Sequence, residues 1–88
     1  MRFQYDPSKA AANLRKHRVS FADAEGVFGD PLAITLEDPD AEGEPRYVAV
    51  ALGSAGELLV VVYSAREDEI RLISARRATR KERKQYAT

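Results

Sequence analysis

The stretch LLVVVYS, residues 58–64, constrains the fold most, because no charged side chain interrupts it and Ser64 is its first small polar residue. A strand of alternating polar and apolar residues needs cover on one face, whereas a strand apolar on both faces needs cover on both. The stretch is also far shorter than the roughly 20 apolar residues of a membrane-spanning helix. We therefore expect a central strand, with helices over both faces or one face left for a partner protein.

Three further segments bounded by turn residues predict strands beside it, at residues 33–37, 46–52 and 70–75. The acidic loop EDPDAEGEP and the turn GSAGE connect consecutive strands, which favours an antiparallel order. A short alternation at Phe3 and Tyr5 can form an additional edge strand.

Three cap signals predict helices. Asp6 followed by Pro7 is typical of a helix start and predicts a helix to about Lys16. Ser20 predicts a second helix over residues 21–28, and the Thr79 and Glu82 spacing of a capping box opens a third. We expect one domain, residues 1–88, of the α+β class, in which N-terminal helices and a C-terminal helix pack on a four-stranded, mainly antiparallel sheet.

The formal net charge of zero hides a segregation of charge along the chain. Residues 1–20 carry +4, residues 21–69 carry −10 and residues 70–88 carry +6. If the two basic ends meet, they form one cationic surface; the alternative is that these charges solvate outer helix faces. The chain has no cysteine and no signal-peptide pattern, so we expect a cytoplasmic protein without disulfides and no membrane association.

Candidate chemistry gathers at His17 and at the end of the last predicted strand. His17 can act as an acid or base near neutral pH, or cap a helix end. Arg76 and Arg77 stand at a strand-to-helix junction, where guanidinium groups suit phosphate or can pair with an acidic loop residue. Alternation predicts Leu72, Ser74 and Arg76 on one face of the strand and Ala75 and Arg77 on the other.

The C-terminal helix adds Arg80, Arg83 and Tyr86, a combination that suits RNA backbone and base stacking or a plain solvated helix. Nucleotide-binding, serine-hydrolase and zinc-protease motifs are absent from the sequence, and one histidine does not make a zinc site. We expect no cofactor and no metal.

Two long, ordered segments resemble the BrnT toxin family (DUF497). The first is FQYDPSKAAANLRKHRVSFADAEGVFGDP and the second is EIRLISARRATRKERKQY. The residues that match are Tyr5, Asp6, Lys9, Asn13, Lys16, His17, Val19, Phe21, Ala24, Phe28, Asp30 and Pro31, and then Arg71, Ile73, Ser74, Ala75, Arg76, Ala78, Thr79, Glu82, Arg83 and Tyr86. One departure is Arg18, where the family commonly has a glycine.

The resemblance implies a type II toxin with a RelE-like fold, an endoribonuclease that arrests translation. It also implies a BrnA-like antitoxin that neutralises the toxin and binds DNA, so that DNA is contacted only indirectly. On this basis we expect catalytic roles for Lys9, His17, Arg76 and Arg77, in metal-free cleavage by the RNA 2′-hydroxyl. RNA-binding roles are expected for Asn13, Lys16, Arg80, Arg83 and Tyr86, although Asn13 and Lys16 can instead fasten the first helix to the sheet.

Two other classes of function stay open from the residues alone. A non-catalytic RNA- or ribosome-binding module would share the basic surface and leave RNA intact. A protein-interaction subunit would use that surface only for an acidic partner. The doubly apolar strand supports a partner in either case, because three short helices leave part of it to be covered.

Overall fold

The structure is a computed structural model that describes residues 1–86. Five strands form one sheet in the order β1-β5-β4-β3-β2. The strands are β1 (Arg2–Gln4), β2 (Ile34–Glu37), β3 (Arg46–Leu52), β4 (Leu58–Arg66) and β5 (Glu69–Arg77). The helices are α1 (Pro7–His17), α2 (Phe21–Ala24), the 3₁₀ helix η1 (Glu25–Gly29) and α3 (Arg80–Gln85).

The sheet is mixed and has five strands, so the expected count of four is wrong. Strands β2 to β5 form the predicted antiparallel meander, with β4 in its interior. The additional strand β1 lies parallel to β5, with Phe3 opposite Ile70. It pairs in this direction because α1 and the meander separate it from β5 in the chain, and such a long connection permits parallel pairing.

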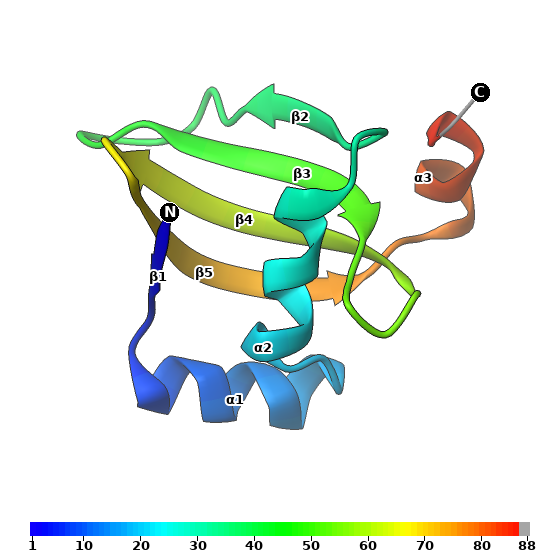
Figure 1. Cartoon of the computed structure of the whole chain (residues 1–88), viewed down its shortest axis with the longest axis horizontal. Helices are drawn as coiled ribbons and strands as arrows, with labels where there is room; N and C mark the ends of the chain where they lie inside the picture. Colours follow the sequence, from blue (N-terminus) through cyan, green and yellow to red (C-terminus); the bar gives the residue numbers. More distant parts are fainter. Residues whose placement is uncertain (87–88) are drawn as a thin grey trace.

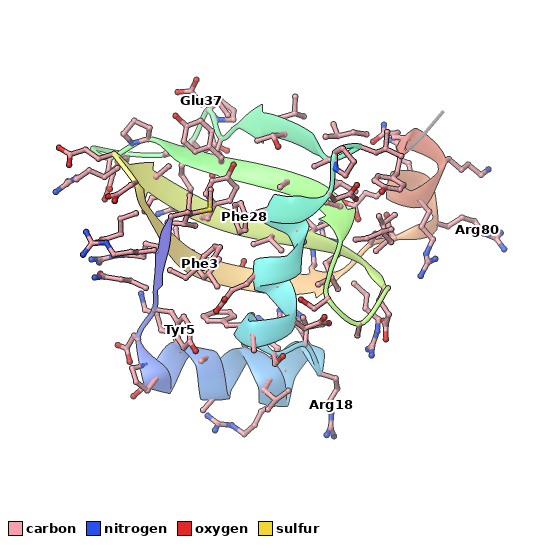
Figure 2. The ribbon with its side chains drawn as sticks, in the orientation of Figure 1. Phe3, Tyr5, Arg18, Phe28, Glu37 and Arg80 are labelled. Atoms are coloured by element: carbon pink, nitrogen blue, oxygen red, sulfur yellow. The ribbon has the colours of Figure 1, made fainter. Side chains whose placement is uncertain are left out.

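The main core lies between the sheet and the three N-terminal helical segments, which Figure 1 shows on one side of the sheet. Phe21, Val27, Leu59, Val61 and Leu72 are its largest fully buried side chains. A chain of aromatic contacts closes one end of this core. Phe28 packs between Phe3 and Tyr63, at ring-centroid distances of 5.3 and 4.8 Å (Figure 2).

The opposite face of the sheet has a smaller core, in which Leu58, Val60 and Ala78 are buried and Tyr86 packs against them. The six-residue helix α3 lies at the end of the sheet where β5 finishes (Figure 1). Of the two alternatives for β4, cover on both faces applies at that end, whereas Val62 farther along the strand is only half-buried on the second face.

The two basic ends of the chain meet only in part, because Arg71 of β5 lines the same cavity as Lys9 of α1, whereas α3 lies elsewhere. Helix α1 lies beside the first face of the sheet, and Figure 1 shows α3 well apart from it. The cations of α3 therefore lie apart from those of α1 (Figure 1).

A bulge in β5 overturns the expected alternation of its side chains. Tyr63 of β4 is opposite Leu72 while its neighbour Val62 is opposite Ser74, so Ile73 is an extra residue. An extra residue reverses the facing of every side chain after it. Leu72 and Ala75 consequently both lie in the main core, whereas the uninterrupted alternation placed them on opposite faces of the sheet.

The predicted caps are confirmed. Asp6 accepts a hydrogen bond from the Ser8 amide at 2.8 Å, and Ser20 accepts one from the Asp23 amide. Thr79 and Glu82 form both bonds of a capping box. The second helix is shorter than expected, because the chain tightens into η1 after Ala24.

Arg18 ends α1 with φ of 60°, and its amide bonds to the Leu14 carbonyl. This left-handed conformation explains why glycine suits the position, since glycine adopts it without steric cost. Within the described residues, no helix has the length and apolar character needed to cross a membrane.

Candidate active site

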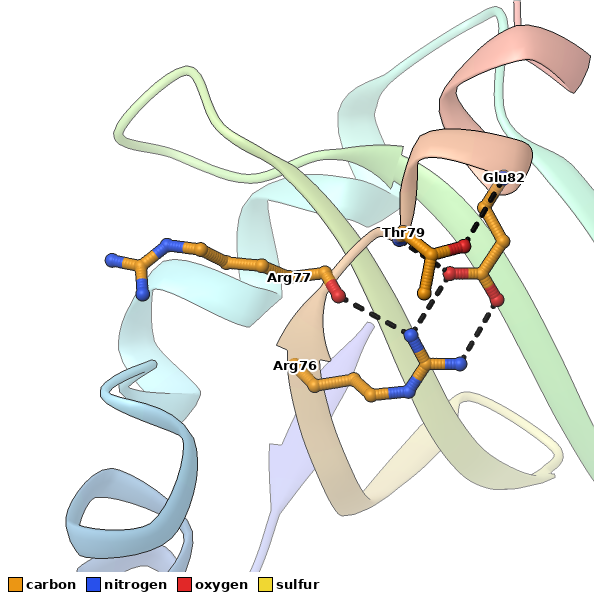
Figure 3. A network of polar contacts seen from close by, with 4 residues as sticks. All are labelled: Arg76, Arg77, Thr79 and Glu82. Atoms are coloured by element: carbon orange, nitrogen blue, oxygen red, sulfur yellow. Dashed lines mark hydrogen bonds and ion pairs between the residues drawn. The ribbon is translucent and has the colours of Figure 1, made fainter.

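The two arginines expected to bind phosphate, Arg76 and Arg77, diverge (Figure 3). Arg76 lies on the side of α3, and both terminal nitrogens of its guanidinium bond to Glu82 oxygens at 2.9 Å (Figure 3). Arg77 projects in another direction and pairs with Glu57, near the turn between β3 and β4. The two arginines diverge because neighbouring residues of a strand point to opposite faces of the sheet. The bulge decides which face each arginine takes.

Both arginines already hold an anion in this conformation. The hydrogen bonds from Arg76, and then from the Thr79 amide, lower the pKa of Glu82 to about 2. The hydrogen bond and charge of Arg77 likewise lower the pKa of Glu57. Both carboxylates are therefore ionised at neutral pH, and RNA phosphate would have to displace them.

The Asn13 side chain is buried within the protein, since the residue is only 7% exposed. Its side-chain amide donates to the carbonyls of Val19 and Ala75, at 2.9 and 2.8 Å, and accepts from the Ala75 amide at 3.1 Å. The side chain thus bonds both backbone groups of Ala75, as a neighbouring strand would. The alternative role of Asn13, fastening the first helix to the sheet, describes its position.

Tyr86 also bonds within the protein. Its hydroxyl donates to the Asp30 carboxylate, and its ring packs on the smaller core. The amide of Leu52, then the Tyr86 hydroxyl and the Leu32 amide, lower the pKa of Asp30. Its bond to Asp30 raises the pKa of Tyr86, which makes this tyrosine a poorer proton donor.

The remaining expected residues are spread over the molecule. Lys9 and His17 lie eight residues apart on α1, which is roughly 12 Å along a helix axis. Lys16, Arg80 and Arg83 are exposed, and Arg80 extends away from the sheet in Figure 2. Of these five side chains, the structure brings only Lys9 into a cavity with another cation.

That cavity, of about 650 Å³, lies beside the outer edge of β5. Strand β1 ends at Gln4 opposite Arg71, and Asp6 then turns the chain into α1. The edge of β5 is next engaged at Ala75, by Asn13, which leaves an open stretch between the two contacts. The residues that line the cavity are Phe3, Gln4, Tyr5, Asp6, Lys9, Glu25, Arg71, Leu72 and Ile73.

The cavity combines two cations with two carboxylates. Lys9 and Arg71 are exposed, and the described residues offer neither of them an ion pair within 4.0 Å. Asp6 is engaged by the Ser8 amide, whereas the part of the chain that the structure describes gives the Glu25 side chain no hydrogen bond. Cations that hold no other anion can bind a phosphate, and an adjacent carboxylate can accept a proton.

Sequence reasoning missed Arg71 and Glu25 as members of a site. Arg71 reads from the sequence as an exposed strand charge, although it is one of the residues that match the BrnT pattern. Glu25 carries no signal in the sequence, because only the packing of η1 brings it to the cavity that Lys9 also lines. Across residues 1–86, no three histidine, aspartate or glutamate side chains are grouped so as to hold a metal ion.

Comparisons with known proteins place the chain in a family. The family described as "Ribonuclease toxin, BrnT, of type II toxin-antitoxin system" matches residues 5–82. The chain belongs to the BrnT family of ribonuclease toxins. A toxin of a type II toxin–antitoxin system has an antitoxin as its partner, so this BrnT-family chain has one.

A solved structure of similar fold is that of the Brucella abortus ribonuclease toxin BrnT. It superposes with a TM-score of 0.69 over 91% of this chain and 99% of the other, at 22% sequence identity. At that identity the likeness concerns the fold. No curated protein sequence matches the chain.

Proposed function

We propose that this chain is a BrnT toxin that cuts cytoplasmic RNA without a metal ion, arrests translation and is neutralised by a BrnA-like antitoxin. The observation that carries the proposal is the cavity in which Lys9, Arg71 and Glu25 lie together. The antiparallel meander with helices on it agrees with the RelE-like architecture that the family resemblance implies; the parallel strand β1 is an addition to it.

The proposed reaction needs three groups, and the cavity offers a candidate for each. The RNA 2′-hydroxyl attacks the adjacent phosphorus, its proton passes to a base, and the 5′-oxygen leaves with a proton from an acid. Glu25 is the candidate base. Lys9 and Arg71 stabilise the charge that develops on the phosphate oxygens, and Lys9 can protonate the leaving oxygen.

The other expected residues take revised places in this proposal. Lys16, Arg80 and Arg83 are exposed and can contact the RNA backbone away from the cavity. His17 is half-buried and does not line the cavity, so it has no partner there for acid–base chemistry. Arg76, Arg77, Asn13 and Tyr86 keep the internal bonds described above and act on RNA only through the structure they hold.

The test is cleavage of single-stranded RNA by the purified chain, freed of antitoxin and assayed in EDTA. We expect 2′,3′-cyclic phosphate ends, and a loss of roughly 10²–10³ in kcat for Lys9→Met and for Arg71→Met. Arg15→Met, which removes an exposed cation of α1 outside the cavity, is the matched control and should retain activity.

Three results would contradict the proposal. Intact RNA, both free and on ribosomes, would favour a non-catalytic binding module. Cleavage abolished by EDTA and restored by a divalent cation would remove the metal-free mechanism. Full activity of Lys9→Met and Arg71→Met, with loss in folded His17→Ala or Arg76→Ala, would move the site to the far end of β5.

A further inference from the structure

The second face of the sheet carries an aliphatic row that no part of the described chain covers fully. The row consists of Leu36 on β2, Val48 on β3 and Val62 on β4, which are directly opposite one another in the strand register. Leu36 is 67% exposed, and Val48 and Val62 are each half-buried. Aligned apolar side chains left open to water on a small protein are typical of an interaction site.

The aliphatic row lies between a cationic region on one side and an acidic region on the other. On one side, the neighbouring row of Ile34, Val50 and Val60 leads to the end of the sheet where α3 lies, and Ala78 and Tyr86, which flank α3, pack with Val60. Helix α3 carries Arg80, Lys81, Arg83 and Lys84, and the described residues include no carboxylate within ion-pair distance of any of them. On the other side, β2 continues directly into the acidic loop of residues 37–45.

We propose that the aliphatic row and α3 together form the docking surface for an amphipathic segment of the antitoxin. The apolar side chains of that segment cover Leu36, Val48 and Val62, and its acidic side chains meet the cations of α3. An acidic partner fits because α3 presents four cations at the border of an apolar surface, and such complementarity sets both orientation and partner choice. The inference rests on membership of a toxin–antitoxin family and does not depend on the proposed cleavage chemistry.

RNA is a poorer occupant of the same surface. Proteins recognise unpaired bases by stacking on aromatic rings or guanidinium planes, whereas this row is built of branched aliphatic side chains. An occupied α3 would also block Arg80 and Arg83, so the antitoxin would exclude RNA from that part of the surface. Neutralisation then needs no contact with the cavity that holds Lys9.

The experiment measures the affinity of the cognate antitoxin for variants of the full chain, without RNA. Leu36→Asp should weaken antitoxin binding at least tenfold. The double substitution Lys81→Glu and Lys84→Glu should also weaken binding, and its effect should be larger at low salt than at high salt. The matched controls lie on α1, near the other face. Leu14→Asp changes a leucine that is 47% exposed, Arg15→Glu reverses an exposed cation, and both should bind as the unaltered chain does.

Hydrogen exchange of the complex shows where on the chain the antitoxin binds. Protection of β2, β3 and α3 by the antitoxin supports the proposal, whereas protection confined to α1, with full affinity of Leu36→Asp, overturns it. A dimer of the chain alone that Leu36→Asp dissociates would assign the row to a second copy and also overturns it. Protection of the row by single-stranded RNA would do the same.

Discussion

At the scale of single residues, several side chains that match the family motif hold partners within the protein. Asn13 replaces a strand neighbour for Ala75, because β1 is too short to reach that position. Arg76 and Tyr86 match the family pattern as well, and their partners are Glu82 and Asp30. A matched position in a motif therefore identifies a constrained residue, and only the contacts show whether fold or chemistry imposes the constraint.

Asn13→Ala tests this interpretation. The change leaves the buried amide and carbonyl of Ala75 without their side-chain partner, and we expect the free energy of unfolding to fall by about 2–4 kcal/mol. Urea unfolding measures the loss, and Lys16→Ala, exposed on the same helix, should change stability by less than about 0.5 kcal/mol. Unchanged stability combined with lost RNA affinity would return Asn13 to the RNA surface.

At the scale of elements, α3 depends on polar contacts that involve carboxylates. None of its residues is buried, and it is held by the capping box, the Arg76–Glu82 pair and the Tyr86–Asp30 bond. All three attachments involve an ionised carboxylate, that of Glu82 or that of Asp30. Acid should therefore release α3 before it unfolds the main core.

The sign of this pH dependence follows from Glu82, whose pKa of about 2 lies below its ordinary 4.5. A carboxyl with a lowered pKa stabilises the folded state above its ordinary pKa, and that contribution is lost as pH falls from about 4.5 toward 2. Asp30 acts in the same direction. We expect hydrogen-exchange protection of α3 to fall over this range while β4 remains protected.

Glu82→Gln is the matching substitution. It removes the charged partner of Arg76 and should weaken the docking of α3 by about 1–2 kcal/mol at neutral pH. The docking of α3 should then depend less on pH, because only the contribution of Asp30 remains. Glu57→Gln removes an equivalent but more exposed partner, that of Arg77, and should change stability less than Glu82→Gln does. Equal effects of the two substitutions would contradict the special position of Glu82.

At the scale of the whole molecule, a net charge of zero conceals two cationic regions and one acidic region. RNA bound by the cationic regions releases counterions, so affinity should fall steeply with salt despite the neutral total. For about three or four neutralised phosphates on a single strand, the slope of log affinity against log salt should be about −2 to −3. A slope near zero would contradict an electrostatic RNA surface.

Substitutions at the cavity should reduce that slope. Removing Lys9 or Arg71 should make it less steep by about 0.7 for each phosphate that the variant no longer neutralises. Glu37→Gln, in the acidic region, should leave the slope unchanged and serves as the control. Filter binding or fluorescence anisotropy over a salt series measures both slopes.

The sequence by itself determined the local elements of this protein and their order. These elements follow from local signals: the caps at Asp6 and Thr79, the turns, and the doubly apolar β4. Each signal involves residues close together in the sequence, so it can be recognised without the structure. The α+β class and the antiparallel meander follow from these signals. The length and order of the two matched segments were likewise enough to indicate the family.

Only the tertiary structure decided which residues meet. The bulge at Ile73 sends Arg76 and Arg77 to their separate carboxylates, and the parallel pairing of the short β1 leaves the cavity of Lys9 and Arg71 open beside β5. The first outcome depends on a strand register that packing sets, and the second depends on pairing between segments far apart in the chain. No pattern of neighbouring residues encodes such contacts, because they form only when the whole core is assembled.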